Sequence, residues 1–259
     1  MILFIFDLII GMLIISGISM AGVALYARRF IGRVPAATPY VLLLSAAAAW
    51  AVLYALDLLT TTLPLKVAFH NLRFVFMPFL AVLELWLVLA YVKKTEWLRR
   101  DWALLVLVIP VLSAIIAVTS PYHTLFRYNF SISTSGPVPV LIYTEGPFYT
   151  IYFVYSFVLL ILAVLLLITE TRKRGILWEA QTLLLLLALA LPTAINYLSV
   201  EGITPIPGIN MAPVLLWIPA ILYTIALFRY QFLDIVPIAR SRLIEALNML
   251  DRKREPRPP

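Results

Sequence analysis

The chain contains no cysteine and only two histidines in 259 residues. It therefore has no disulfide framework, no thiolate zinc site and no cysteine nucleophile, and two histidines argue against a polyhistidine metal site. Charge is also scarce: 13% of the residues are charged, about half of the roughly 25% typical of soluble domains. So few charges cannot cover the water-facing surface of a 29.2 kDa chain, which excludes a soluble protein.

Apolar residues take the place of the missing charge. The hydrophobic fraction is 63% and the mean hydropathy is +0.99, the reverse of a disordered composition. A bilayer core about 30 Å thick needs roughly 20 apolar residues per helix. Seven stretches of this kind are Ile2–Ala27, Pro39–Leu59, Phe69–Tyr91, Trp102–Val118, Phe148–Thr169, Leu177–Leu198 and Ala212–Phe232. The first is too long for a signal peptide and lacks a basic leader, so we predict an all-α membrane protein with seven transmembrane helices.

The basic residues predict the orientation, because cytoplasmic loops are enriched in Lys and Arg. With the N-terminus outside and the C-terminus cytoplasmic, 17 of the 20 Lys and Arg residues fall inside. Only Lys66, Arg73 and Arg127 are left for the outer side. We therefore expect a multi-pass protein of the cell membrane. Its net charge of +7 reflects topology and contact with anionic lipid headgroups, with no nucleic-acid partner.

One connection, residues 120–147 between the fourth and fifth spans, is long. It holds two runs rich in β-branched and aromatic residues, Leu125–Ser133 and Val138–Thr144, separated by turn residues at 134–137. We predict an extracytoplasmic β-hairpin. The chain then divides into a membrane domain (1–232), an amphipathic linker (233–250) and a basic, Pro-rich tail (251–259) that we expect to be disordered.

Two seven-helix classes can be tested on single residues. A retinal Schiff base needs a lysine inside the seventh span, and all five lysines lie in or beside predicted loops. A eukaryotic-type G-protein-coupled receptor would end its third helix on an acidic–Arg–Tyr motif, where this chain has Tyr91-Val-Lys-Lys94. No P-loop, zinc signature or Gly-x-Ser-x-Gly elbow occurs. We therefore predict no enzyme activity, no catalytic residue, no metal and no cofactor.

Ionisable residues within spans are costly and mark functional sites. Asp57 and Arg73 lie about one turn from the outer ends of neighbouring antiparallel helices, so we expect an ion pair between them. His70 lies one turn from Arg73, and Asp7 lies at a similar depth in the first span. Together they predict a polar layer beneath the outer surface, which either clamps the helices or contacts a ligand.

Glu84 differs because it lies near the middle of its span, where a charge is expensive. It either joins helices as a neutral group or serves as a switch, and Asn196 is a candidate partner. Trp50 and Tyr54 lie one turn apart and either pack or line a pocket.

The exit from the last span carries the most specific motif. Residues Ala226–Arg240 read ALFRYQFLDIVPIAR, and Thr119–Phe126 read TSPYHTLF. With Glu145-Gly-Pro147, Gln181, Pro192 and Asn196, these resemble in order and spacing the seven-helix N-terminal membrane region of prokaryotic sensory histidine kinases. The resemblance covers residues 1–245. Ser120 departs from it, since the family mostly has Asn there.

The resemblance implies a sensory input domain. It would pass an external or intramembrane stimulus to a cytoplasmic kinase or another signalling output. Kinase motifs are absent, so the sequence is expected to be either a piece of a longer protein or a partner of a separate output. The ligand would be a small molecule or a lipid, and His123 would either contact it or fix the hairpin. Residues expected to transmit the signal are Arg229, Asp234, Pro237, Arg240, Leu243 and Leu247.

Two alternatives stay open at this stage. The linker forms either a short dimer seam, with Leu243 and Leu250 at d and Leu247 at a, or a single helix on the inner leaflet. The rival function is a small transporter or channel. Against it stand the lack of an internal repeat and the expected absence of paired helices broken by Gly or Pro.

Overall fold

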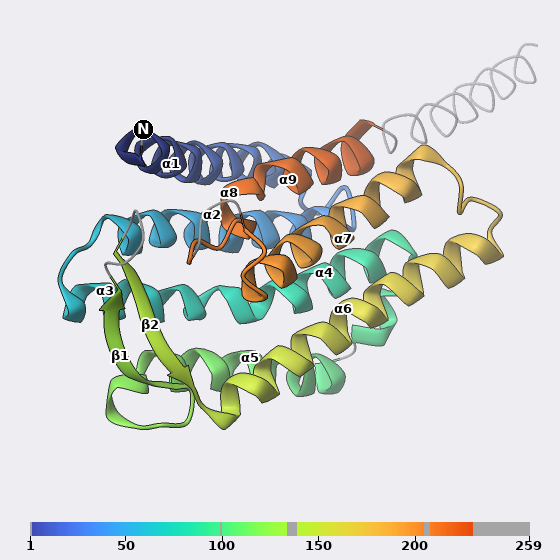
Figure 1. Ribbon diagram of the computed structural model, residues 1–259. Helices are drawn as coiled ribbons and strands as arrows, with labels where there is room; N and C mark the ends of the chain where they lie inside the picture. The colour runs from blue at the N-terminus through green and yellow to red at the C-terminus, as the bar shows by residue number, and fades with distance from the viewer. Residues whose placement is uncertain (1, 99, 134–138, 205–207, 230–259) are drawn as a thin grey trace, which may run out of the picture.

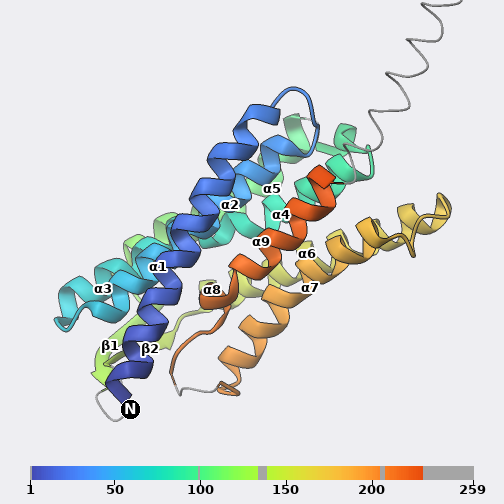
Figure 2. The same ribbon diagram turned by 90° about the horizontal axis from the view of Figure 1, so that it is seen from above.

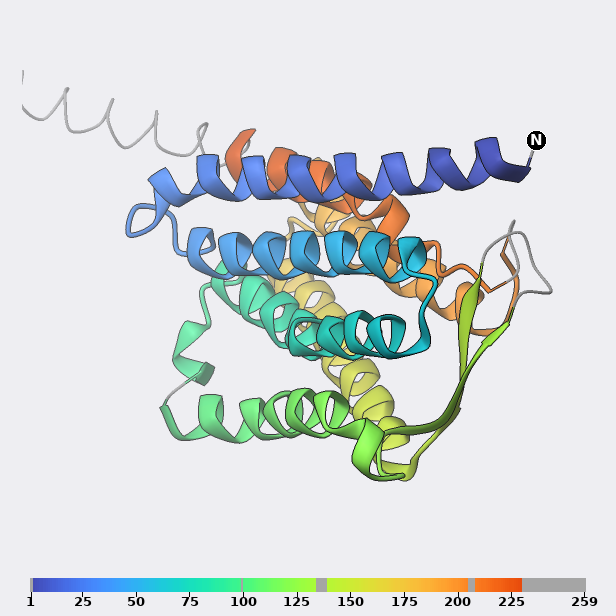
Figure 3. The same ribbon diagram turned by 90° about the vertical axis from the view of Figure 1, so that its left-hand side faces the viewer.

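The computed structural model describes residues 2–98, 100–133, 139–204 and 208–229. Helices fill the length of the molecule, and a two-stranded β-hairpin crosses one end of them (Figure 1). We call this the hairpin end and the other the opposite end. The N-terminus lies at the hairpin end, as Figure 3 shows from the side.

Nine α-helices are described. They are α1 (Ile2–Ala27), α2 (Ala37–Leu59), α3 (Leu63–Leu72), α4 (Met77–Tyr91), α5 (Arg100–Val118), α6 (Pro147–Lys173), α7 (Ala180–Val200), α8 (Ala212–Leu215) and α9 (Trp217–Thr224). Six segments are long and apolar enough to cross a bilayer: Phe6–Phe30, Ala37–Leu59, Leu63–Tyr91, Asp101–Val118, Pro147–Lys173 and Ala180–Ser199. The seventh predicted span is a shorter apolar helix, Ala212–Phe228, and residues 230–232 of that prediction lie outside the described residues.

The third span differs from its prediction in both its start and its shape. It begins at Leu63 rather than Phe69, and a 3-10 turn, Arg73–Val75, divides it into α3 and α4. Pro78 explains the division, since proline has no N–H to donate and its ring clashes with the carbonyl four residues back. The earlier start places Lys66 inside α3, so its assignment to a loop is wrong.

The last described segment is also interrupted. A break at Leu216 separates α8 from α9, with Pro213 on one side and Pro219 on the other. A π-helical turn, Ile225–Arg229, follows α9. The described residues therefore contain two helical segments that are interrupted next to a proline, α3–α4 and α8–α9. The prediction that the chain lacks a pair of helices broken by Gly or Pro is wrong. Both α8 and α9 lie between α1 and α7 (Figure 2).

The hairpin forms where it is predicted, with small shifts at its ends. Strands β1 (Arg127–Ser133) and β2 (Val140–Glu145) pair antiparallel, with Arg127 opposite Glu145 and an irregularity between Tyr128 and Ser131. The predicted turn, residues 134–137, lies entirely outside the described residues. The strands lie against α3 across the helix ends (Figure 1).

Two glycines allow the hairpin to fit closely. A Cβ at Gly146, where β2 returns to α6, would lie 2.2 Å from the Thr124 carbonyl oxygen, so no other residue fits. Gly208 has a φ of +81°, and a Cβ there would lie 3.0 Å from Val140 of β2. The hairpin therefore touches the segment that leads into α8.

Candidate functional site

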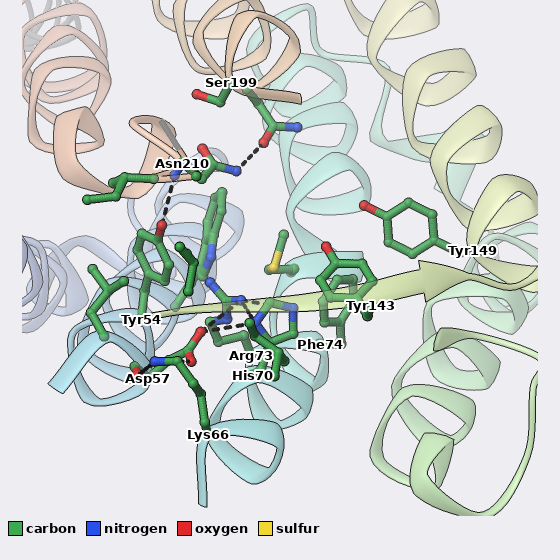
Figure 4. A pocket seen from close by; sticks show the side chains of 18 of the residues that line it. Tyr54, Asp57, Lys66, His70, Arg73, Phe74, Tyr143, Tyr149, Ser199 and Asn210 are labelled. Atoms are coloured by element: carbon green, nitrogen blue, oxygen red, sulfur yellow. Dashed lines mark hydrogen bonds and ion pairs between the residues drawn. The ribbon is translucent and has the colours of Figure 1, made fainter. Parts of the chain in front are cut away.

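Asp57 lies in the last turn of α2, at the hairpin end, within a cluster of basic side chains (Figure 4). Its Oδ2 lies 3.0 Å from His70 Nδ1 and 3.2 Å from Arg73 Nη2, and its Oδ1 lies 3.6 Å from Lys66 Nζ. The ion pair between Asp57 and Arg73 that the sequence predicts is present. Asp57 is 3% exposed, Lys66 0% and Arg73 6%, so these charges meet in a site that is almost free of solvent.

Lys66 fastens α2 to α3. Its Nζ donates to the Asp57 carbonyl oxygen at 2.5 Å and to the Thr60 carbonyl oxygen at 3.1 Å. Carbonyls at the end of a helix lack intrahelical donors, and a cation there also meets the negative end of the helix dipole. Lys66 thus stabilises the tight connection between the helices, which is the clamp role the sequence left open for this layer.

Arg73 connects the charge cluster to the loop before α8. Its guanidinium carbon lies 4.6 Å from the centre of the Tyr54 ring, in cation–π range. The Tyr54 hydroxyl in turn accepts from the Asn210 backbone N–H at 2.8 Å (Figure 4). Asn210 is itself a junction: its Nδ2 donates to Asn196 Oδ1 at 2.8 Å, and its Oδ1 accepts from the Ala212 N–H at 2.9 Å.

Arg127, at the start of β1, is completely buried. Its Nη2 donates to Asn71 Oδ1 at 2.8 Å, and its guanidinium carbon lies 4.1 Å from the centre of the Phe74 ring and 5.2 Å from that of Tyr143. Burial lowers the pKa of Arg127 to about 10, so it is still protonated at neutral pH. Glu145 lies opposite it in the hairpin, and partial burial raises the pKa of that carboxyl while Arg127 opposes the rise.

These groups surround a cavity of about 280 Å³ between the hairpin, the α3–α4 segment and the loop before α8. We call it the hairpin cavity. Six of the predicted ligand-binding residues line it: Trp50, Tyr54, Asp57, His70, Arg73 and Asn196. Asp7 is exposed on α1 and does not line it.

Glu84 lies deeper, beside a second and smaller cavity of about 110 Å³. Trp50, Tyr152 and Asn196 line both cavities, so the two are neighbours. The side-chain oxygen of Asn196 accepts a hydrogen bond from Asn210 and not from Glu84. Within the described part of the chain Glu84 has no hydrogen-bond or ion-pair partner, so its predicted pairing with Asn196 is not formed.

His123 lies beyond α5 and does not line the hairpin cavity. Its Nδ1 accepts from the Leu125 N–H at 3.3 Å, and its Nε2 lies 2.9 Å from the Thr119 hydroxyl, which bonds back to the Ile115 carbonyl oxygen at 2.8 Å. These bonds tie the entry of the hairpin to the end of α5. The geometry favours the structural role for His123.

The signal-transmission residues fall largely beyond what the structure describes. Arg229 ends the π-helical turn after α9. Asp234, Pro237, Arg240, Leu243 and Leu247 lie outside the described residues, as do the linker and the tail. Within the described ranges, no group of three or more His, Cys, Asp or Glu side chains could hold a metal ion.

Sequence reasoning missed four contributors to this site: Lys66, Arg127, Tyr143 and Asn210. The charge pattern places the two basic residues on the outer side and gives no indication that they are buried, yet each is 0% exposed. Their neighbours carried a signal, since Lys66 lies between Leu65 and Val67, and Arg127 follows Phe126. A charge inside an apolar run that begins a helix or strand is better interpreted as buried.

A model of the family described as the N-terminal 7TM region of histidine kinase matches residues 12–237, most of the chain. The chain belongs to this family. It is a multi-pass membrane protein and a sensory membrane input domain, as its resemblance to sensory histidine kinases implied. Comparison with curated proteins gave no match, and comparison with solved structures gave none either.

Proposed function

We propose that this input domain recognises its stimulus in the hairpin cavity, on the outer side of the membrane, and passes it through α9 to a cytoplasmic output such as a histidine kinase. The observation that carries the proposal is the position of Asn210. It bonds to two residues of the cavity wall, Tyr54 and Asn196, and to the first residue of α8. A change in the cavity can therefore reach the last helix through this one residue, by its backbone N–H and its side chain.

The remainder of the path follows the last helix to the opposite end. Tyr40 of α2 donates from its hydroxyl to the Ala220 carbonyl oxygen of α9 at 3.0 Å. Gln181 of α7 donates to the Ala226 carbonyl oxygen at 2.8 Å, within the π-helical turn. Such turns occur often at functional sites because they leave a local irregularity in the helix. We propose that this turn absorbs movement of α9 before the linker.

The orientation in this proposal rests on the distribution of charge. Basic residues crowd the connections at the opposite end, among them Arg28, Arg33, Lys94 and Arg174. Cytoplasmic connections carry such an excess. The hairpin and the N-terminus are then outside the cell, and the linker is inside it.

The test fuses a histidine kinase catalytic module after Leu250 and measures its autophosphorylation in membrane vesicles. Asn210→Ala should change basal phosphorylation at least about fivefold, the lower range of allosteric couplings. The matched control is Asn129→Gly, which removes an exposed asparagine and tolerates the φ of 54° at that position. Equal phosphorylation by the parent chain and by folded Asn210→Ala protein would reject this route.

We further propose that residues 233–250 act as a signalling linker that pairs two copies of the chain. Kinases of this kind phosphorylate within dimers, and Leu243 and Leu247 have coiled-coil spacing. The chain has no native cysteine, so single cysteines can be introduced cleanly. Leu243→Cys and Leu247→Cys should crosslink between copies more efficiently than Ser241→Cys and Glu245→Cys. Equal crosslinking at all four positions would reject the proposed coiled-coil contact between the two linkers.

The interruptions in the α3–α4 and α8–α9 segments favour a second candidate, a small transporter or channel. Such proteins place broken helices at their substrate site. A flux assay in vesicles with panels of ions and small metabolites separates the two functions. Flux that Arg73→Lys alters would support transport.

A further inference from the structure

The buried charges around the hairpin cavity do not balance. Three fully or almost fully buried cations, Lys66, Arg73 and Arg127, stand against Asp57, the one buried carboxylate described at this end of the bundle. The other buried carboxylate in the described residues, Glu170, lies near the end of α6 at the opposite end. Glu145 also lines the cavity, but its side chain is exposed. Lys66 and Arg73 both pair with Asp57, whereas Arg127 has no carboxylate within ion-pair distance among the described residues. The region therefore holds an excess of positive charge in a site that excludes solvent.

The unsatisfied polar atoms of the cavity wall are mainly donors. Trp50 Nε1 and Arg73 Nε are buried and have no hydrogen-bond partner among the described residues, and both side chains line the cavity. Trp50 is 5% exposed and Arg73 6%. Asp57 Oδ1 is the one unsatisfied acceptor on this wall, and it already faces Lys66 Nζ at 3.6 Å. A buried donor without an acceptor destabilises the folded protein, so a ligand that supplies acceptor oxygens would bind favourably in this cavity.

The rest of the wall is aromatic. Phe74, Tyr143 and Tyr149 line the cavity (Figure 4). Trp50 and Phe153 line it as well. A volume of about 280 Å³ lies just below the roughly 300–1,000 Å³ usual for ligand pockets. The small volume and the aromatic lining thus fit one small ring rather than a large molecule.

We propose that the hairpin cavity binds a small aromatic carboxylate. Its carboxylate accepts hydrogen bonds from Arg73 Nε and Trp50 Nε1, and its ring packs on the aromatic wall. Arg127 does not line the cavity but lies against two of its lining rings, Phe74 and Tyr143, where its charge adds to the attraction for an anion. This inference rests on the proposed function, because it names the stimulus of the same cavity.

A cationic ligand fits the same wall less well. Aromatic rings attract cations, but here the guanidinium groups already lie against them, Arg73 over Tyr54 and Arg127 over Phe74. An ammonium group would therefore meet like charge and would leave both unsatisfied donors without an acceptor.

The test uses the purified full chain in lipid nanodiscs and calorimetric titration with four ring probes. Benzoate and phenylacetate should bind at least about tenfold more tightly than neutral benzamide, a difference that one charge-assisted hydrogen bond can supply. Benzylamine should bind more weakly than benzamide. Decanoate distinguishes a lipid source of the carboxylate from a small aromatic acid, and it should bind more weakly than benzoate. Tighter binding of benzamide, benzylamine or decanoate than of benzoate overturns the proposal, as does benzoate binding weaker than about 1 mM.

Two variants test the assigned contacts without removing the ion cluster. Trp50→Phe keeps an aromatic ring and loses the donor, so benzoate should bind about tenfold more weakly while benzamide changes less. Trp86→Phe is the matched control, since Trp86 lines a separate apolar groove between α2, α4 and α5. Glu145→Gln removes the exposed negative charge at the cavity and should tighten benzoate binding severalfold. Unchanged benzoate affinity in both Trp50→Phe and Glu145→Gln overturns the assignment.

These measurements need no output domain. If benzoate binds as expected while Asn210→Ala leaves kinase output unchanged, the proposed route fails and the ligand class stands. If benzylamine binds best while Asn210→Ala alters output, the ligand class fails and the receptor role stands.

Discussion

The two ends of the bundle both hold ion pairs, but in opposite environments. At the hairpin end, Asp57 meets Lys66 and Arg73 with all three side chains below 10% exposure. At the opposite end, Glu170 meets Lys94 at 3.0 Å and Lys173 at 2.8 Å, and these lysine side chains are 27% and 69% exposed. At the hairpin end every member of the cluster is thus buried, whereas at the opposite end a buried Glu170 pairs with lysines that reach solvent.

The two environments carry different energetic costs. Burying charge costs more than a single ion pair returns unless geometry and hydrogen bonds are nearly complete. Exposed pairs cost little and contribute little, and basic side chains at a membrane surface also meet anionic headgroups. Burial of charge is therefore more costly at the hairpin end, where two buried donors, Trp50 Nε1 and Arg73 Nε, also lack an acceptor among the described residues. This combination is the basis of the binding site that we propose.

Reporter fusions have the largest expected effect, because they test which end of the bundle lies outside the cell. After Leu250, a reporter that works only in the cytoplasm should be active. Within residues 134–136, a reporter that works only outside the cell should be active. The physical reason is the excess of Lys and Arg on one side of the bundle. An external result for the Leu250 fusion would reverse the orientation and place the hairpin cavity inside the cell.

Removing the acid at each end should give the next largest contrast. Asp57→Ala leaves buried cations without a counter-charge and should cost about 3–5 kcal/mol in the free energy of unfolding. Glu170→Ala should cost clearly less, because its lysine partners are solvated. Thermal unfolding of the detergent-solubilised protein measures both losses.

A double variant tests the Asp57–Arg73 contact itself. Asp57→Ala with Arg73→Ala should cost less than the sum of the single changes, since the two residues share one interaction. Additive losses would show that the 3.2 Å contact carries no coupling energy.

Arg127→Met separates the effect of this buried charge on the free energy of unfolding from its effect on ligand affinity. The change removes a buried charge whose described partners are Asn71 and aromatic rings, while it keeps an apolar stem. We expect the free energy of unfolding to stay within about 1 kcal/mol of the parent value or to rise. Benzoate affinity should fall severalfold because the positive field weakens. A loss of stability as large as that of Asp57→Ala would instead make Arg127 a structural clamp.

His123→Ala should have the smallest effect. It removes the bonds that tie the hairpin entry to Thr119 and Leu125, at a cost of about 1 kcal/mol. Benzoate affinity should not change, because His123 does not line the cavity. Tyr122→Ala is the control, since Tyr122 is 89% exposed. Unchanged unfolding with lost binding would favour ligand contact over the structural role.

Local patterns in the sequence predicted much of the architecture. Hydropathy located six spans that the structure bears out, and alternating β-branched residues located the hairpin. The motifs around Asn196 and the exit after Ala226 identified the family. Each of these features depends on residues close together in the chain, which is why sequence alone suffices for them.

The tertiary structure decided which charges are buried and what they surround. Arg127 is buried because β1 packs on α3, where it bonds to Asn71, a residue 56 positions away. Asn210 becomes a junction only because the loop before α8 lies against Tyr54, 156 positions away. Burial of a charge depends on the partners that the fold supplies, and composition cannot name partners so distant. Hydropathy and local motifs are therefore sufficient to infer the membrane helices and the family of the chain. The cavity and its unsatisfied donors form only when segments far apart in the chain pack together.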